Sequence, residues 1–152
     1  MGRDNWSTGG FFAQMEHNVF IVGQDKGGAF QITDMLTGGL FSGYFSNIKE
    51  SYPVGSLHNA HYLMPDLWVN QPFNDTYQNV MQPWSTLNKN SEAAGTQAVT
   101  ALGNIVKVFG MARITDMYGP IPYSKFGTAL KVAYDSQEDV YRQFLSLIHI
   151  SE

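Results

Sequence analysis

The chain has 152 residues, of which 43% are hydrophobic and 14% charged, with a net charge of −4. Such a length can bury a core of its own, and the composition excludes a disordered tail and a charged helical rod. The nine Lys and Arg residues are scattered singly, which argues against a nucleic-acid partner, and the absence of cysteine excludes disulfides, thiolate metal sites and a cysteine nucleophile.

The first half of the chain contains two helical patterns separated by irregular sequence. Thr8 is a suitable N-cap for a helix over residues 10–20 that has one apolar side. Dense glycines oppose long regular elements over residues 23–44, although a short helix around 31–36 fits the pattern. Residues 46–71 carry prolines and aromatic side chains without helical spacing. We therefore predict a long loop there, and such loops are usually functional or disordered.

Two longer helices are predicted in the second half. Pro72 fits the first turn of a helix that continues to about Leu87, because apolar side chains follow at steps of three and four. Pro83 should bend this helix, and the polar residues 89–95 should end it. A third helix begins near Thr96 or the residue after it.

This third helix ends in a rigid aromatic turn. Gly119 can take the left-handed conformation that closes a helix, Pro120 cannot continue one, and Pro122 keeps the following chain extended. The turn therefore fixes the directions of Tyr118 and Tyr123.

Two charged residues interrupt the apolar arc of the same helix. Arg113 and Asp116 lie three positions apart within the arc, whereas Lys107 is expected on the opposite, polar side. Since a lone buried charge is costly, we expect a structural ion pair that also holds backbone groups of the turn. Binding of another buried group is the alternative.

A last helix is predicted to start within residues 134–139, where Asp135 or Ser136 would act as the cap and an acidic residue three positions later would reach back. Two antiparallel helices joined by an ordered turn form the hairpin of a helical repeat, although no second copy establishes a period. The chain is therefore predicted to be mainly α-helical.

Two motifs occur in a characteristic order. Residues 114–124 have the sequence ITDMYGPIPYS, and residues 134–141 have the sequence YDSQEDVY. This combination resembles the SusD/RagB family of nutrient-binding outer-membrane lipoproteins, and the resemblance covers residues 5–145. It implies an all-α fold of tetratricopeptide-like helical hairpins with long irregular loops, of which this chain is the incomplete N-terminal part.

The resemblance also implies a location and a partner. Family members lie at the surface of Bacteroidota-type cells, anchored to the outer membrane by an acylated cysteine. Without catalysis or a cofactor, they deliver glycans or peptides to a SusC-like, TonB-dependent transporter. Residues 1–7 lack a secretory signal pattern, and no apolar run could span a bilayer, so we expect the chain as written to be soluble. Residues 1–145 would be a partial family member and residues 146–152 a non-native tail.

A carbohydrate site is predicted in the loop over residues 46–71. Sugar rings stack their C–H faces on aromatic side chains, and their hydroxyls need amides and carboxylates nearby. The candidate ligand-binding residues are Trp68, Tyr62, Asp66 and Asn70. The alternative is that Trp68 packs the loop onto the helices. The residues expected to be structural are Arg113, Asp116, Tyr118, Gly119, Pro120, Pro122 and Tyr123.

Two other functions stay open. One is a helical-repeat scaffold that binds another protein, and the other is a metal-dependent hydrolase that uses His58, His61 and Asp66. The HxxH spacing falls in a predicted loop and lacks the glutamate of a zinc-binding helix, so an ordinary pair of histidines is the simpler interpretation. No glycine pattern fits nucleotide binding.

Overall fold

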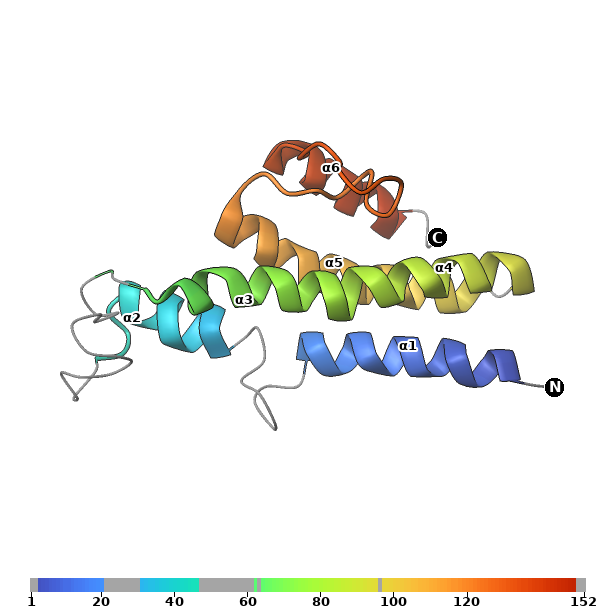
Figure 1. The fold of residues 1–152 in the computed structure, drawn as a ribbon, viewed down its shortest axis with the longest axis horizontal. Coiled ribbons are helices and arrows are strands. Elements are labelled where there is room, and N and C mark those ends of the chain that lie inside the picture. The colour runs from blue at the N-terminus through green and yellow to red at the C-terminus, as the bar shows by residue number, and fades with distance from the viewer. Residues whose placement is uncertain (1–2, 21–30, 47–61, 63, 96, 150–152) are drawn as a thin grey trace. The chain divides into compact units, whose positions relative to one another are not determined.

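The computed structural model describes residues 3–20, 31–46, 62, 64–95 and 97–149. Within these ranges every regular element is a helix and there is no strand (Figure 1). A single isolated β-bridge joins Ile121 to Asp135 in the described part of the chain. The elements are α1 (Arg3–Phe20), η1 (Gln31–Gly38), α2 (Gly39–Phe41), α3 (Asp66–Thr76), η3 (Tyr77–Met81), α4 (Gln82–Ala94), α5 (Gln97–Tyr118) and α6 (Gln137–His149). The predicted all-α class is confirmed.

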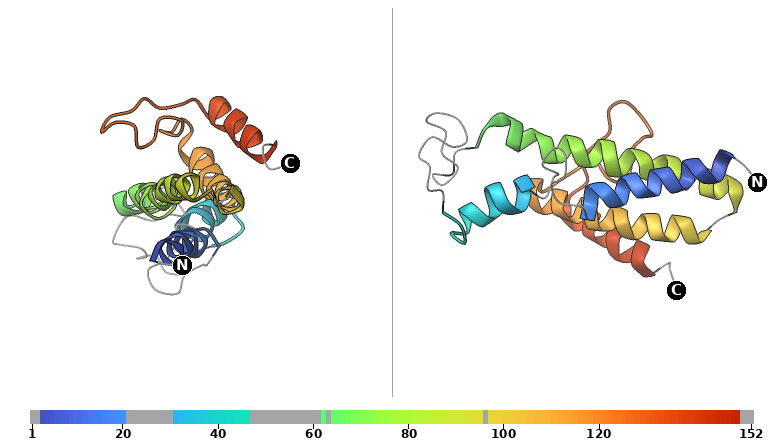
Figure 2. Two further views of the ribbon diagram at one scale, coloured as in Figure 1. Left: turned by 90° about the vertical axis from the view of Figure 1, so that its right-hand side faces the viewer. Right: turned by 90° about the horizontal axis from the view of Figure 1, so that it is seen from below.

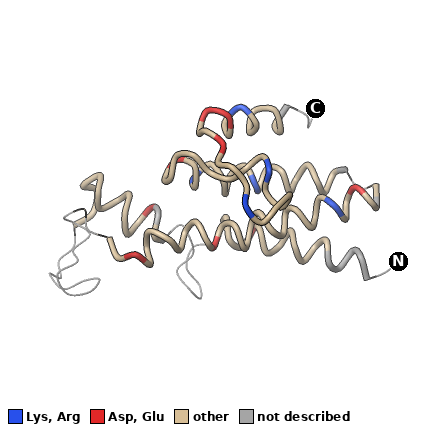
Figure 3. Tube along the Cα trace, turned by 45° about the horizontal axis from the view of Figure 1, so that its top comes forward, with Lys and Arg blue, Asp and Glu red and all other residues tan. Residues whose placement is uncertain are grey.

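The helices belong to two compact units. The first comprises Met1–Phe20 and Thr76–Glu152, and the second comprises Ile21–Asp75. In the first unit α1, α4 and α5 lie side by side, and α6 packs on α5 (Figure 2). The few charged residues are spread along the described trace (Figure 3). No described helix combines the length and apolar character that a membrane crossing requires.

The core of the first unit forms where α1, η3 and α5 meet. Its buried cluster consists of Met15, Val19, Val80 and Val106. Gly110 lies at this contact, because a Cβ added there would be 3.1 Å from Val19 Cγ2 and 3.3 Å from Val80 Cγ1. The absence of a side chain at Gly110 therefore permits close packing of α5 on the other two helices.

The helices before residue 65 differ from prediction at their boundaries. Thr8 lies inside α1, which begins at Arg3, so the predicted cap was wrong. The residues that precede Thr8 contain no breaker after Arg3, and a capping preference alone is a weak signal. The short helix expected around 31–36 is confirmed and is π-helical, ending at Gly38.

The start of α3 was also predicted too late. This helix begins at Asp66, so the end of the predicted loop over residues 46–71 was wrong, and Pro72 lies buried inside the helix. Pro65 marks the start, because its carbonyl accepts hydrogen bonds from the N–H groups of Trp68 at 2.9 Å and Val69 at 3.3 Å. Proline suits a first turn, but tertiary packing can also retain it further along a helix.

The next helices agree with the sequence pattern in part, because α4 continues to Ala94, beyond its predicted end at about Leu87. Pro83 lies in the first turn of α4, directly after the π-helical turn η3. Proline lacks the N–H that would bond the preceding turn, which accounts for irregular backbone there. Gly95 closes α4 with a left-handed φ of 67°, and α5 begins at Gln97 as predicted. Residues 146–149 continue α6, and their non-native origin stays a prediction.

Candidate functional site

The aromatic turn after α5 is closed by hydrogen bonds at its glycine. Gly119 has a φ of 74°, and its N–H donates to the Thr115 carbonyl at 2.8 Å. In return, Thr115 Oγ1 donates to the Gly119 carbonyl at 2.7 Å. The left-handed helix stop predicted from the sequence is therefore confirmed.

Asp135 fixes the chain beyond the turn. Its carboxylate accepts hydrogen bonds from the backbone N–H groups of Tyr123 at 3.0 Å and Ser124 at 2.7 Å, and from Ser124 Oγ at 2.7 Å. Partial burial acts to raise the pKa of Asp135, but the bonds from Ser124 and Tyr123 and the charge of Lys125 outweigh it and hold the pKa below its ordinary value. Asp135 is thus part of the turn, and the cap of α6 is the next residue.

Ser136 and Asp139 form a reciprocal cap at the start of α6. The Asp139 N–H donates to Ser136 Oγ at 3.1 Å, and Ser136 Oγ donates to the Asp139 carboxylate at 2.6 Å. Gln137 Nε2 also donates to the Thr115 carbonyl at 3.0 Å, which ties α6 to the end of α5. Both sequence motifs therefore serve the α5–α6 joint.

The charged pair expected near the joint has a different environment. Asp116 is exposed, so its predicted burial was wrong, and its carboxylate accepts hydrogen bonds from Tyr141 Oη at 2.7 Å and Gln137 Nε2 at 3.4 Å. Arg113 is half-buried. Asp116 contributes to the joint by binding α6, and its pairing with Arg113 stays a prediction.

Lys107 occupies the buried position that the sequence analysis missed. Only 4% of this residue is exposed. Its Nζ lies 3.4 Å from the centroid of the Trp84 ring and 4.2 Å from that of the Tyr123 ring. Burial lowers the pKa of Lys107 to about 7. Its predicted place on the polar side of the helix was therefore wrong. Burial is possible because the long aliphatic stem of lysine can lie along apolar surface.

In the second unit, Tyr62 presents an aromatic ring at the surface. The residue is 70% exposed and has a φ of 61°, which is uncommon for a side chain of this size. Its hydroxyl donates to the Phe41 carbonyl at 3.2 Å, and the ring centroids of the two residues are 5.0 Å apart. These contacts hold the Tyr62 ring in place while leaving most of it accessible.

Three other candidate ligand residues lie on the first two turns of α3. Asp66 and Asn70 are exposed, and Asn70 Nδ2 donates to the Asp66 carbonyl at 2.8 Å, so the helix brings these two together. Trp68 is only 9% exposed. This burial favours the packing role that the sequence analysis left open for Trp68, while the ligand site as a whole stays a prediction.

The described residues give no support to the metal-site alternative. His58 and His61 lie outside them. Among the residues with described positions, no group of three or more His, Asp or Glu side chains could hold a metal ion.

Comparison with known proteins identifies the family. The pattern of SusD-like proteins, described as SusD and RagB outer membrane lipoproteins, matches residues 1–150. The chain belongs to the SusD/RagB family. No curated individual protein matches it.

Solved structures of SusD homologues share the fold. A chitin-binding SusD homologue from Flavobacterium johnsoniae is 33% identical with a TM-score of 0.78, and the match covers 92% of this chain and 28% of that chain. A homologue from Bacteroides uniformis is 29% identical with a TM-score of 0.76, covering 96% of this chain and 30% of that one. A homologue from Bacteroides ovatus is 28% identical with a TM-score of 0.73, and the match covers 97% of this chain and 29% of that one.

This SusD-like chain thus spans less than a third of the length of these solved relatives. Its helical, tetratricopeptide-like fold class is the one predicted. The motifs that carried the resemblance build the α5–α6 joint, where their polar groups bond one another. They identify the family and shape the fold, and ligand residues have to be sought elsewhere.

Proposed function

We propose that the full-length protein is a cell-surface lipoprotein of the outer membrane that captures a glycan and passes it to a SusC-like, TonB-dependent transporter. The observation that carries this proposal is the family match over residues 1–150, together with a 33% identical relative that binds chitin. The proposal contains no catalytic step and no cofactor. A peptide ligand and a protein-binding scaffold are the alternatives.

Within this chain, we propose that Tyr62 supplies the ring on which a sugar unit stacks. Its exposed face and its fixed position on Phe41 support this role, because an ordered ring loses little entropy on binding. Asp66 and Asn70, four to eight residues further on, would bond sugar hydroxyls through a carboxylate and an amide. Trp68 would support them from within the fold.

The test is electrophoresis of the full-length protein through gels that contain soluble polysaccharides, including glycol chitin. We expect at least one polysaccharide to retard the protein and Tyr62→Ala to weaken this retardation about 2- to 12-fold, since an aromatic contact contributes about 0.5–1.5 kcal/mol. Tyr134→Ala is the matched control, because Tyr134 is also exposed and lies in the other unit.

Two results would count against the proposal. Equal retardation of the Tyr62→Ala and Tyr134→Ala variants would remove Tyr62 from the site. Passage of the wild-type protein without retardation through every gel would favour a peptide ligand or a protein partner.

A further inference from the structure

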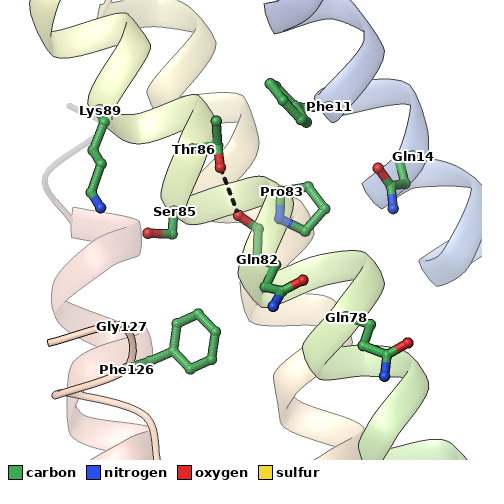
Figure 4. Close-up of a pocket in the computed structure, with 10 residues that line it drawn as sticks. All are labelled: Phe11, Gln14, Gln78, Gln82, Pro83, Ser85, Thr86, Lys89, Phe126 and Gly127. Atoms are coloured by element: carbon green, nitrogen blue, oxygen red, sulfur yellow. Dashed lines mark hydrogen bonds between the residues drawn. The ribbon is translucent and has the colours of Figure 1, made fainter. Parts of the chain in front are cut away.

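A hollow of about 450 Å³ lies in the unit formed by Met1–Phe20 and Thr76–Glu152 (Figure 4). We call it the α4 groove, because a row of side chains on η3 and α4 forms much of its wall. The volume falls within the range of about 300–1,000 Å³ that small-molecule sites occupy. The groove has no residue in common with the Tyr62 region.

Polar side chains follow one side of the helix along this wall. They are Gln78, Gln82, Ser85 and Lys89, at intervals of four, three and four residues. Such spacing places side chains on a single helical face. Figure 4 shows the amides of Gln78 and Gln82 projecting from the same side of the helix.

These polar groups are available to a ligand. Within the residues that the structure describes, the amides of Gln78 and Gln82, the Ser85 hydroxyl and the Lys89 ammonium make no hydrogen bond or ion pair with the protein. Each amide offers a donor and an acceptor, and the hydroxyl offers both. The row therefore presents both donors and acceptors along one edge of the groove, with the Lys89 ammonium donating only.

Phe126 faces this row from the loop between α5 and α6 (Figure 4). Its ring centroid is 5.6 Å from that of Tyr77. Tyr77 is in turn held by a hydrogen bond of 2.9 Å from its hydroxyl to the Pro122 carbonyl. The half-buried Phe126 ring is thus fixed by the rigid turn and is ordered before any ligand arrives.

The combination of a flat apolar ring with a row of amides and a hydroxyl suits a saccharide. A sugar unit has an apolar C–H face for an aromatic ring and hydroxyl edges that both donate and accept hydrogen bonds. No carboxylate lines the groove. We propose that the α4 groove is a second saccharide-binding site, separate from the Tyr62 region, that holds a short neutral oligosaccharide between Phe126 and the Gln78–Lys89 face.

This inference rests on the proposed function, because both sites would bind units of the same kind of glycan. It is tested by isothermal titration calorimetry of the full-length protein with chitotriose, cellotriose and maltotriose. We expect at least one trisaccharide to bind at two sites per protein molecule. The double variant Gln78→Ala/Gln82→Ala should lose one site. Phe126→Leu, which keeps apolar bulk against Tyr77 without the flat ring, should weaken the same site about 2- to 12-fold.

Asn90→Ala is the matched control, since Asn90 is an exposed amide on α4 outside the groove. It should leave two sites. Circular dichroism and thermal unfolding should be unchanged in the glutamine variant, because both glutamines are exposed.

The outcomes separate the two proposals. A single site that Tyr62→Ala abolishes and Gln78→Ala/Gln82→Ala leaves intact would overturn the second site alone. A single site with the reverse dependence would support the groove and contradict the proposed Tyr62 site. No binding of any of the three trisaccharides to a wild-type protein that a polysaccharide gel retards would overturn the second site alone, and no binding together with unretarded passage through every gel would overturn both.

Discussion

Lys107 is the residue whose environment has the clearest consequence for stability. Burial lowers its pKa to about 7 in the folded protein, whereas an unfolded lysine keeps its proton up to about pH 10.4. Between these values the unfolded chain binds more protons, so the free energy of unfolding should rise with pH, by at most about 1.4 kcal/mol per pH unit. Below pH 7 both states are protonated and this contribution should be flat. Chemical denaturation at a series of pH values from 6 to 9.5 measures it.

Lys107→Met provides the comparison. Methionine has a similar length and can lie against Trp84 and Tyr123 without a buried charge, so stability at pH 7 should be unchanged or higher. The rise of the free energy of unfolding with pH should disappear in this variant. Burial also raises the pKa values of Tyr77 and Tyr123. Above about pH 10 the unfolded chain therefore loses these protons first, and the free energy of unfolding falls with pH. The pH series stops before that range. Persistence of the full slope in Lys107→Met would show that other groups cause it.

Lys107 and Asp116 also show why the sequence predicted the orientation of α5 poorly. Apolar side chains spread over about half of this helix, yet Leu102 and Phe109 among them are each 52% exposed. Hydrophobic periodicity alone cannot choose among several apolar faces of one helix. The choice depends on partners distant in sequence, here the ring of Trp84.

Among the elements, α6 depends on its cap. Ser136→Ala removes the hydroxyl that accepts the Asp139 N–H, and it should lower the free energy of unfolding by about 1 kcal/mol. Ser146→Ala is the control, because Ser146 is exposed on the same helix and should tolerate alanine. Denaturant unfolding of both variants measures the difference, and equal stability would show that the cap contributes little.

The turn before α6 depends on the charge of Asp135. Asp135→Asn leaves an amide beside donors from Tyr123 and Ser124, and we expect a loss of about 2 kcal/mol at neutral pH. The lowered pKa means that this stabilisation is present above the unfolded pKa of about 3.9 and is lost as the pH falls through the folded value.

Glu138→Gln is the control for this variant. Its carboxylate pairs with Arg142 at the surface, where both side chains are more than 70% exposed, so it should change stability by under about 1 kcal/mol. An Asp135→Asn variant as stable as Glu138→Gln at pH 7 would contradict the role of the carboxylate. Denaturant unfolding again provides the measurement.

At the scale of elements, sequence signals with a specific backbone requirement were the most reliable. Gly119 closing α5 was predicted, and the cap of α6 was narrowed to Asp135 or Ser136, because a left-handed φ and an orphan N–H each need a particular residue type. Boundaries inferred from Thr8 and Pro72 were wrong, since helices continue through such residues when packing favours them. The α4 groove could not be predicted, because Phe126 meets the helical row only in three dimensions.

At the scale of the whole molecule, large apolar side chains are exposed on α5 and α6. Leu102 and Phe109 on α5 and Leu145 on α6 are each more than half exposed, and the solved relative from Flavobacterium johnsoniae matches over only 28% of its own length. We expect the isolated 152-residue chain to bind the dye ANS more strongly and to unfold at a lower temperature than the full-length protein. Equal dye binding and equal melting temperatures would contradict this expectation.

The central claim, capture of glycan at the cell surface, is tested most directly on intact cells that carry the full-length gene. The measurement is surface fluorescence after incubation with labelled oligosaccharides, including a chitin oligosaccharide, for wild-type cells, gene-deleted cells and cells that produce the Tyr62→Ala protein. The account predicts that at least one oligosaccharide labels wild-type cells strongly, deleted cells weakly and Tyr62→Ala cells to an intermediate or low level. Labelling that is the same in all three strains for every oligosaccharide would contradict it.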